Sequence, residues 1–330
     1  MPRKKVVVIG GGTGSYNLLR GLKKYVLRGD EDESIELTAI VTTMDSGGSS
    51  GVLRDEYGVL PPGDLRRCLI ALSDETEILK KLFQYRFEAG KSEALNGHNF
   101  GNLFLTALKN ILGSEEKAIE EAHKILKVRG RILPITLESS NLCAELEDGT
   151  IIKGETFIDL PRSTSHLRIR RVYLEPKVSV NKRVIDAINE ADAIVIGPGD
   201  LFTSIIPNLL FEDVVRAIIN SKAIKIYNCN IMTKYGETNN FSVADHFNAI
   251  EEYTEKDAIN VVTYNNKKAS QKVLEGYKKE NAEQVQFNEN EFHNKKARVI
   301  GRDLMTEPNI IRHDPDKIGY LIMEIVFKHV

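Results

Sequence analysis

Tryptophan is absent from this 330-residue sequence, and cysteine occurs only three times, at Cys68, Cys143 and Cys229. The cysteines are far apart and form no CxxC motif, so they have neither the spacing of a zinc site nor the number that a disulfide framework needs. A chain of this length buries about three quarters of its unfolded surface and needs no such cross-link. We therefore expect a protein of a reducing compartment, the cytoplasm.

Long apolar runs and an excess of one charge are also missing. No stretch approaches about 18 consecutive apolar residues, which predicts that the chain has no transmembrane helix. The 45 basic and 47 acidic side chains give a net charge of −2, which argues against nucleic acid or a membrane as the main partner. A small-molecule ligand is expected instead, and the composition allows a homo-oligomer or a regulatory protein partner.

Short β-branched runs alternate with amphipathic helical stretches along most of the sequence. Strands are expected at residues 6–9, 35–41, 193–196, 224–227, 259–263 and 297–300. Helices are expected at residues 15–27, 100–112, 115–128, 208–220, 242–253 and 316–328, with one more that starts at the capping-box-like pair Asp74 and Glu77. This alternation predicts an α/β protein with a Rossmann-like, doubly wound, mostly parallel sheet.

Two segments interrupt the alternation. Residues 42–63 are rich in Gly, Ser and Pro, which predicts a long loop of a kind that is usually functional. Apolar residues alternate with a period of two over residues 131–175, with turn signals between them, which predicts a β-rich insertion. We therefore divide the chain into a Rossmann-like core, residues 1–130 and 179–330, and an insertion, residues 131–178, packed on that core.

A glycine-rich loop follows the first expected strand and precedes a helix. Glycine allows the backbone to approach a ligand closely, and the free N–H groups of a helix start can hold phosphate. The loop departs from the GxGxxG dinucleotide fingerprint because its third glycine position is a serine. A tight turn without a ligand is the alternative. The candidate binding residues of this loop are Gly11, Gly12, Thr13, Gly14 and Ser15.

Acidic side chains in the next segment allow a metal site. Asp45 follows the second expected strand and could contact a ribose or a metal ion. Asp45, Asp55 and Asp64 could together hold Mg²⁺ beside a phosphate, although an aspartate after glycine, such as Asp64, is commonly a helix cap. His98, in Asn-Gly-His-Asn before a helix, could be an acid–base group or could only satisfy the helix start.

A second glycine loop follows another buried strand. It contains Gly197, Gly199 and Thr203, and it repeats the pattern of a permissive backbone followed by hydroxyl groups. Two such loops at one edge of a sheet suggest a diphosphate or another two-part ligand. The strand after it ends near Asn230 and Thr233, whose side chains can recognise the amide and hydroxyl groups of a base or a sugar.

Six motifs together resemble a known family. GGGTGS, DSGGSSG, PGDLRR with ALSD, GHNFGNL, GPGDLFTS and NIMTKYGET are similar to the gluconeogenesis factors, or YvcK proteins, of the superfamily of CofD, the 2-phospho-L-lactate transferase. The resemblance implies a cytosolic protein that serves cell shape and peptidoglycan precursor supply during gluconeogenic growth. It also implies a UDP-sugar ligand such as UDP-N-acetylglucosamine, with a nicotinamide dinucleotide as another occupant of the same cleft.

The resemblance also implies roles for single residues. Gly11 to Gly14 would meet the diphosphate, and Asn230 with Thr233 would line the sugar or nucleotide side. Tyr264 would stack on uracil, and Arg302 would pair with phosphate. Tyr264 could equally be an ordinary strand-end aromatic residue, and Arg302 a surface charge.

Two enzymatic readings compete with a binding protein. The first is a metal-dependent, CofD-like phosphoryl-lactyl transferase that uses a nucleotide diphosphate donor, with Asp45, Asp64 and His98 as its candidate catalytic residues. The second is an NAD-dependent dehydrogenase, which Ser15 and the missing acid at the end of the second strand disfavour. No catalytic activity is implied for the gluconeogenesis factors, and the sequence has no P-loop, HExxH motif or Ser–His–Asp order.

Overall fold

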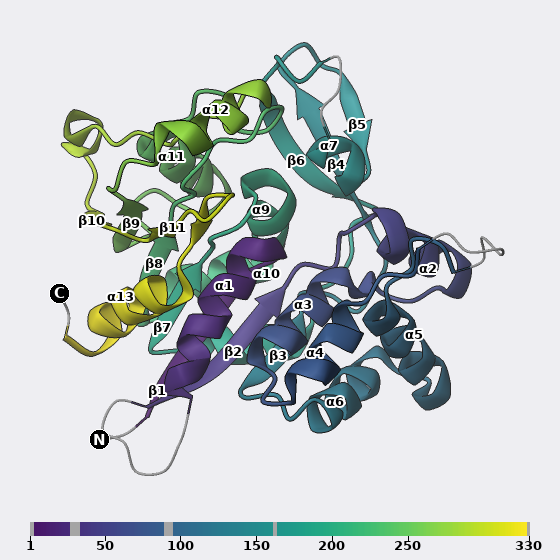
Figure 1. Cartoon of the computed structure of the whole chain (residues 1–330). Helices are drawn as coiled ribbons and strands as arrows, with labels where there is room; N and C mark the ends of the chain where they lie inside the picture. Colours follow the sequence, from purple (N-terminus) through teal and green to yellow (C-terminus); the bar gives the residue numbers. More distant parts are fainter. Residues whose placement is uncertain (1–2, 27–33, 89–94, 161–163, 329–330) are drawn as a thin grey trace.

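A parallel sheet forms the centre of the computed structural model, which describes residues 3–26, 34–88, 95–160 and 164–328 (Figure 1). Within these ranges the sheet has seven strands in the order β10-β9-β8-β7-β1-β2-β3, and all neighbours are parallel. This confirms the predicted α/β fold. The strands are β1 (Lys4–Gly10), β2 (Ile35–Val41), β3 (Arg131–Pro134), β7 (Ala193–Ile196), β8 (Ile224–Asn228), β9 (Val261–Asn265) and β10 (Arg298–Arg302).

Helices connect the strands and cover the sheet. Among the described residues, none of them has both the length and the apolar character that a membrane crossing requires. The helices are α1 (Gly12–Leu22), α2 (Gly48–Tyr57), α3 (Pro62–Leu72), α4 (Glu77–Gln84), α5 (Phe100–Leu112), α6 (Glu115–Ile125), α7 (Glu155–Asp159), α8 (Lys182–Asn189), α9 (Ile206–Leu209), α10 (Glu212–Asn220), α11 (Val243–Tyr253), α12 (Gln271–Lys279) and α13 (Pro315–Lys328). Shorter turns are η1 (Lys23–Tyr25), η2 (Leu201–Ile205) and η3 (Glu289–Phe292).

Strand β1 lies in the middle of the core because its side chains are buried on both faces. Val6 and Val8 pack in one apolar cluster with residues of α1, α3 and α13. Val7 and Ile9 pack in the other cluster, with residues of α8, α10 and α11. Successive side chains of a strand point to opposite faces, so this apolar run needs helices on both sides, as a doubly wound sheet provides.

A small antiparallel sheet lies at one end of the molecule, above the central sheet in Figure 1. It has the order β5-β4-β6 and carries the short helix α7, and its apolar residues join the cluster under α8, α10 and α11. Strand β3, with which the predicted insertion begins, pairs with β2 in the central sheet. The strands of the small sheet are β4 (Asn141–Leu146), β5 (Ile151–Lys153) and β6 (Ile169–Glu175), and a separate hairpin is formed by β11 (Met305–Thr306) and β12 (Arg312–His313).

The prediction of a long loop over residues 42–63 is wrong, because this segment contains α2 and the start of α3. Its serines and glycines have low helix propensity, and tertiary hydrogen bonds hold α2 instead. The Ser49 hydroxyl accepts from the Asn99 N–H at 3.2 Å and from the Asn102 amide at 3.3 Å. Gly58, with a φ of 60°, ends the helix.

Four predicted helices differ from the structure by more than one residue, and one of them, predicted for residues 115–128, ends at Ile125. The first begins at Gly12 and is α-helical to Leu22, and residue 27 lies outside the described residues. The helix predicted to start at the pair Asp74 and Glu77 begins at Glu77, since Asp74 does not cap it but pairs with Lys23 and Arg129. The helix predicted for residues 208–220 is divided into α9 and α10.

Candidate functional site

A cleft of about 950 Å³ opens where four neighbouring strands of the central sheet end. The connections after β1 and β2 run to one side of the sheet and those after β7 and β8 run to the other, so β1 and β7 flank the switch point of the topology. Ligands of open α/β sheets bind outside the carboxyl ends of the strands at this point. Residues that follow β1, β2, β7 and β8 all line the cleft.

The two glycine-rich loops lie against each other across the switch point. The Ser15 hydroxyl donates to the carbonyl oxygen of Pro198 at 3.2 Å. A Cβ atom at Gly14 would lie 2.5 Å from the same oxygen, so only glycine allows this approach. The start of α1 has no side-chain cap, and its first N–H groups therefore point to the cleft without an intrahelical partner.

Asp64, in the first turn of α3, lies directly behind the first glycine loop. A Cβ atom at Gly11 would lie 2.6 Å from its Oδ2. Asp64 accepts a hydrogen bond from the backbone of Gly12 and one from Arg67 at 3.0 Å. Burial raises the pKa of the Asp64 carboxyl to about 6, although Arg67 opposes the shift. A carboxyl group with a pKa near 6 is partly protonated close to neutral pH and can exchange its proton for a metal ion.

Asp45 and Glu155 bring two further carboxylates to the same wall. Asp45 accepts from the Gly47 N–H at 3.0 Å, and Glu155 comes from α7 of the small sheet. Burial, followed by the charges of Asp45 and Asp159, raises the pKa of Glu155 to about 8. The repulsion shows that these carboxylates are short of positive charge, and their hard oxygen atoms suit Mg²⁺.

The three aspartates predicted as a magnesium set are not brought together. Asp45 and Asp64 line the cleft, whereas Asp55 is exposed on α2 and pairs with Arg54 at 2.9 Å. Glu155 lines the cleft with Asp45 and Asp64, but among the described residues the three carboxylates close enough to share a metal ion are Asp159, Asp200 and Glu237. Glu155 could not be predicted from a sequence pattern, because α7 has only five residues and no complete apolar period.

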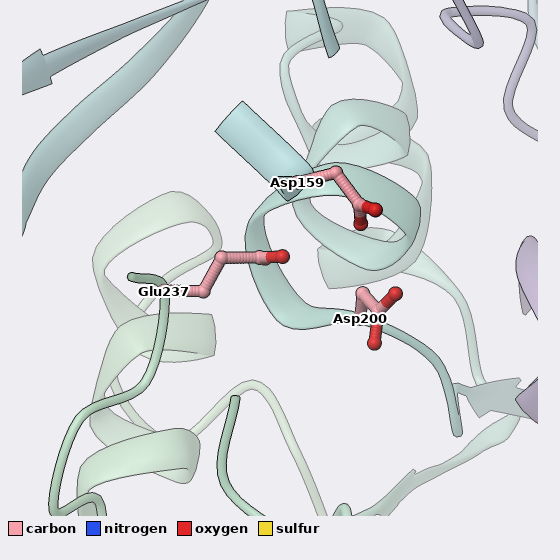
Figure 2. Close-up of side chains that lie close together, drawn as sticks. All are labelled: Asp159, Asp200 and Glu237. Carbon is pink, nitrogen blue, oxygen red and sulfur yellow. The ribbon is translucent and has the colours of Figure 1, made fainter. Parts of the chain in front are cut away.

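A second cluster of acidic side chains surrounds Lys234 near the C-terminal end of α7. Figure 2 shows Asp159, Asp200 and Glu237 converging from three different segments. Lys234 pairs with all three, at 2.9 Å to Asp200 and 3.0 Å to Glu237. Burial alone would lower the pKa of Lys234, but the three carboxylates raise it above its ordinary value. Lys234 therefore joins the insertion to the loops after β7 and β8.

Glu237 is the buried member of this group. Its side chain is 1% exposed, and it accepts from the Phe202 N–H at 3.2 Å and from the Thr203 hydroxyl at 3.4 Å. Burial raises its pKa, and the attraction of Lys234 acts in the opposite direction. The donors come from η2, a single π-helical turn of the kind that often occurs at functional sites.

The structure brings most of the candidate binding residues into the cleft. Gly11, Ser15 and Gly197 lie in the same loops but are not among the described residues that line it. The candidates that line the cleft are Gly12, Thr13, Gly14, Asp45, Asp64, Gly199, Thr203, Asn230 and Thr233.

Three other candidates lie away from the described lining of the cleft. The ring of Tyr264, on β9, stacks on Phe287 with centroids 4.4 Å apart. Arg302, at the end of the edge strand β10, is exposed and donates to the carbonyl of Gly301 at 3.1 Å. His98 Nδ1 lies 3.3 Å from the Ser49 hydroxyl, at the contact between α2 and the segment before α5.

Cationic residues from the C-terminal part also line the cleft. Lys279 at the end of α12 and Arg312 on β12 both face the cleft. Sequence reasoning missed both, because a two-residue strand and a charged helix end have no periodic pattern. Arg312 lines the cleft, whereas Arg302 is not among its described lining residues.

The fold and the cleft define a doubly wound α/β protein with a ligand site at the topological switch point. The family model described as "2-phospho-L-lactate transferase CofD" matches residues 6–305. The chain therefore belongs to the CofD family and, within it, to the gluconeogenesis factors, as the six motifs indicated.

Relatives match the chain over nearly its whole length. The gluconeogenesis factor of Bacillus subtilis is 40% identical over 326 residues, which cover 98% of this chain and 98% of the relative. A relative from Aquifex aeolicus is 44% identical over 329 residues, with 99% and 98% covered. A crystal structure of a UPF0052 family member from Bacillus halodurans superposes with a TM-score of 0.90 at 40% identity and covers 98% of this chain and 100% of that chain.

Proposed function

We propose that the cleft binds a nucleotide sugar similar to UDP-N-acetylglucosamine, and that the chain thereby serves cell morphogenesis and peptidoglycan precursor supply during gluconeogenic growth. The observation that carries the proposal is the contact of the two glycine loops beside the start of α1. The helix start offers N–H donors and the positive end of the helix dipole, which together favour a phosphate group.

The size and lining of the cleft support a ligand with more than one part. A volume of about 950 Å³ is at the upper end of the range of small-molecule sites, about 300–1,000 Å³. Arg312 and Lys279 supply positive charge from the wall of the C-terminal segments, and Asn230 and Thr233 supply groups that can bind a sugar or a base. A nicotinamide dinucleotide has a similar size and also contains a diphosphate.

The charge of the lining favours a divalent cation beside the diphosphate. Six acidic and four basic side chains of the described residues line the cleft, and a diphosphate would add further negative charge. Mg²⁺ between Asp45, Asp64, Glu155 and the diphosphate would offset this repulsion. The acidic lining residues are Asp45, Asp64, Glu155, Asp159, Asp200 and Glu280, and the basic ones are Arg67, Lys234, Lys279 and Arg312.

The same carboxylates favour a second candidate function, a metal-dependent transferase that acts on a nucleotide diphosphate donor. Asp45 and Asp64 would hold the metal ion, which would supply Lewis-acid activation of the donor phosphate. His98 contacts Ser49 instead of lining the cleft, so the acid–base role expected for it has no support from its position.

Calorimetric titration distinguishes these functions. We expect UDP-N-acetylglucosamine to bind more tightly with Mg²⁺ than with a chelator, and ligand at about 100 times the dissociation constant to stabilise the protein by about 2.7 kcal/mol. NAD serves as the competing ligand. UDP-N-acetylglucosamine should remain intact after prolonged incubation with Mg²⁺, whereas a transferase that used it as its donor would consume it. The absence of both binding heat and a thermal shift at millimolar ligand would contradict the proposal.

A further inference from the structure

One residue of the cleft lining, His313, is a buried histidine. It lies on β12, lines the cleft and is only 6% exposed. Its ring forms a hydrogen bond with the backbone of Cys229, immediately after the end of β8. Its other nitrogen, Nε2, is buried and has no hydrogen-bond partner among the described residues.

The chemistry of the ring defines what Nε2 can bind. Burial lowers the pKa of His313 to about 4, so the ring is neutral at pH 7 and carries one proton. The bond to the Cys229 carbonyl uses that proton on Nδ1, since Nε2 is the nitrogen without a partner. Nε2 is therefore a bare acceptor, and a buried acceptor without a donor is costly and rare.

Asn230 places a second acceptor beside the first. It follows Cys229 directly in the chain and lines the same cleft, and its Oδ1 is also buried without a partner among the described residues. Phosphate oxygens are acceptors and cannot satisfy either atom. The N–H groups at the start of α1 suit phosphate, so the cleft offers donors from one set of residues and acceptors from another.

We infer that His313 Nε2 and Asn230 Oδ1 accept hydrogen bonds from hydroxyl groups of the bound ligand, and that they thereby select a polyhydroxylated group next to the diphosphate. The inference rests on the proposed function and adds to it the residues that recognise the hydroxyls. The hydroxyls belong either to the ribose or to the attached sugar, and both present the same O–H donors.

Two substitutions of His313 isolate the acceptor. In His313→Asn the side-chain amide overlaps the position of Nδ1, so it keeps the bond to Cys229 and removes the acceptor. In His313→Gln the amide overlaps the position of Nε2 and restores an acceptor there. The ligands are UDP-N-acetylglucosamine, UDP, 2′-deoxy-UDP and 3′-deoxy-UDP, and thermal unfolding without ligand shows whether each variant folds.

Loss of one hydroxyl and loss of the acceptor are expected to be non-additive. Wild-type protein should bind about tenfold more weakly when the recognised hydroxyl is missing. His313→Asn should bind the intact ligand about tenfold more weakly and lose nothing further with the deoxy ligand, and His313→Gln should recover most of the affinity. If the recognised hydroxyl is on the ribose, UDP should bind more tightly than its deoxy forms. If it is on the attached sugar, UDP-N-acetylglucosamine should bind more tightly than UDP.

Three outcomes overturn the inference in different ways. If His313→Asn weakens all four ligands by one factor, or weakens none, His313 has only a structural role. The comparison of wild-type affinities for the four ligands needs no variant, and equal affinities for all of them also refute hydroxyl recognition. If wild-type protein binds none of the four, the proposed function itself is wrong and the inference falls with it.

Discussion

We expect the Lys234→Met variant to lose about 3 kcal/mol of its free energy of unfolding at pH 7. The substitution leaves the fully buried Glu237 and its neighbours Asp159 and Asp200 without a counter-charge. Removal of one partner from a buried ion pair typically costs about 3–5 kcal/mol, and the partial exposure of Lys234 places the effect at the lower end. Urea denaturation at pH 7 measures the loss.

The control for Lys234 is an exposed lysine that also pairs with a glutamate three residues away, in the reverse order. Lys124 pairs with Glu121 three residues earlier and is 72% exposed, so Lys124→Met should cost less than about 1 kcal/mol. The double variant Lys234→Met/Glu237→Gln should recover part of the stability, because the buried charge is then absent. Equal stability of Lys234→Met and wild-type protein would refute the ion-pair account of this segment.

The Glu155→Gln variant is expected to be more stable than wild-type protein by about 2 kcal/mol at pH 8. The pKa of Glu155 is raised to about 8 in the folded protein, against an unfolded value of about 4.3. The folded state therefore holds more protons between these values, and its stability falls as the pH rises through this window. Glutamine keeps the hydrogen-bonding shape and removes the ionisation cost.

The pH dependence of this gain separates charge from packing. The difference between Glu155→Gln and wild-type protein should be small at pH 4.5, close to the unfolded pKa, and should disappear at lower pH, where Glu155 is protonated in both states. Glu56→Gln, on the exposed side of α2, is the control and should leave the stability within about 0.5 kcal/mol. A gain that is equal at pH 8 and at pH 4.5 would contradict the role of carboxylate repulsion.

The parallel sheet was predictable because most of its strands are short runs rich in β-branched residues, two of which, β1 and β7, lead into glycine. The helices α2 and α3 were not, because Ser49 and Ser50 favour a loop locally and are held by Asn99 and Asn102 from a distant segment. Such contacts between segments far apart in sequence override local propensity, and no single-sequence pattern records them.

The residues of the site also differed in how well they could be predicted from the sequence. The glycine loops were predictable because close backbone contact, such as that of Gly14 with Pro198, leaves a mark in residue type. Arg312, Lys279 and His313 were missed because they reach the cleft from short or charged segments without periodicity. Tyr264 was expected in the cleft, but β9 lies two strands beyond β7, and its ring packs on Phe287 instead.

A crystal structure of the protein with UDP-N-acetylglucosamine and Mg²⁺ tests the central claim most directly. We predict that the diphosphate lies against the N–H groups of Thr13 and Gly14 and beside Gly199, with Mg²⁺ between it and Asp45. A ligand bound outside this cleft, or a diphosphate turned away from the start of α1, would contradict the account.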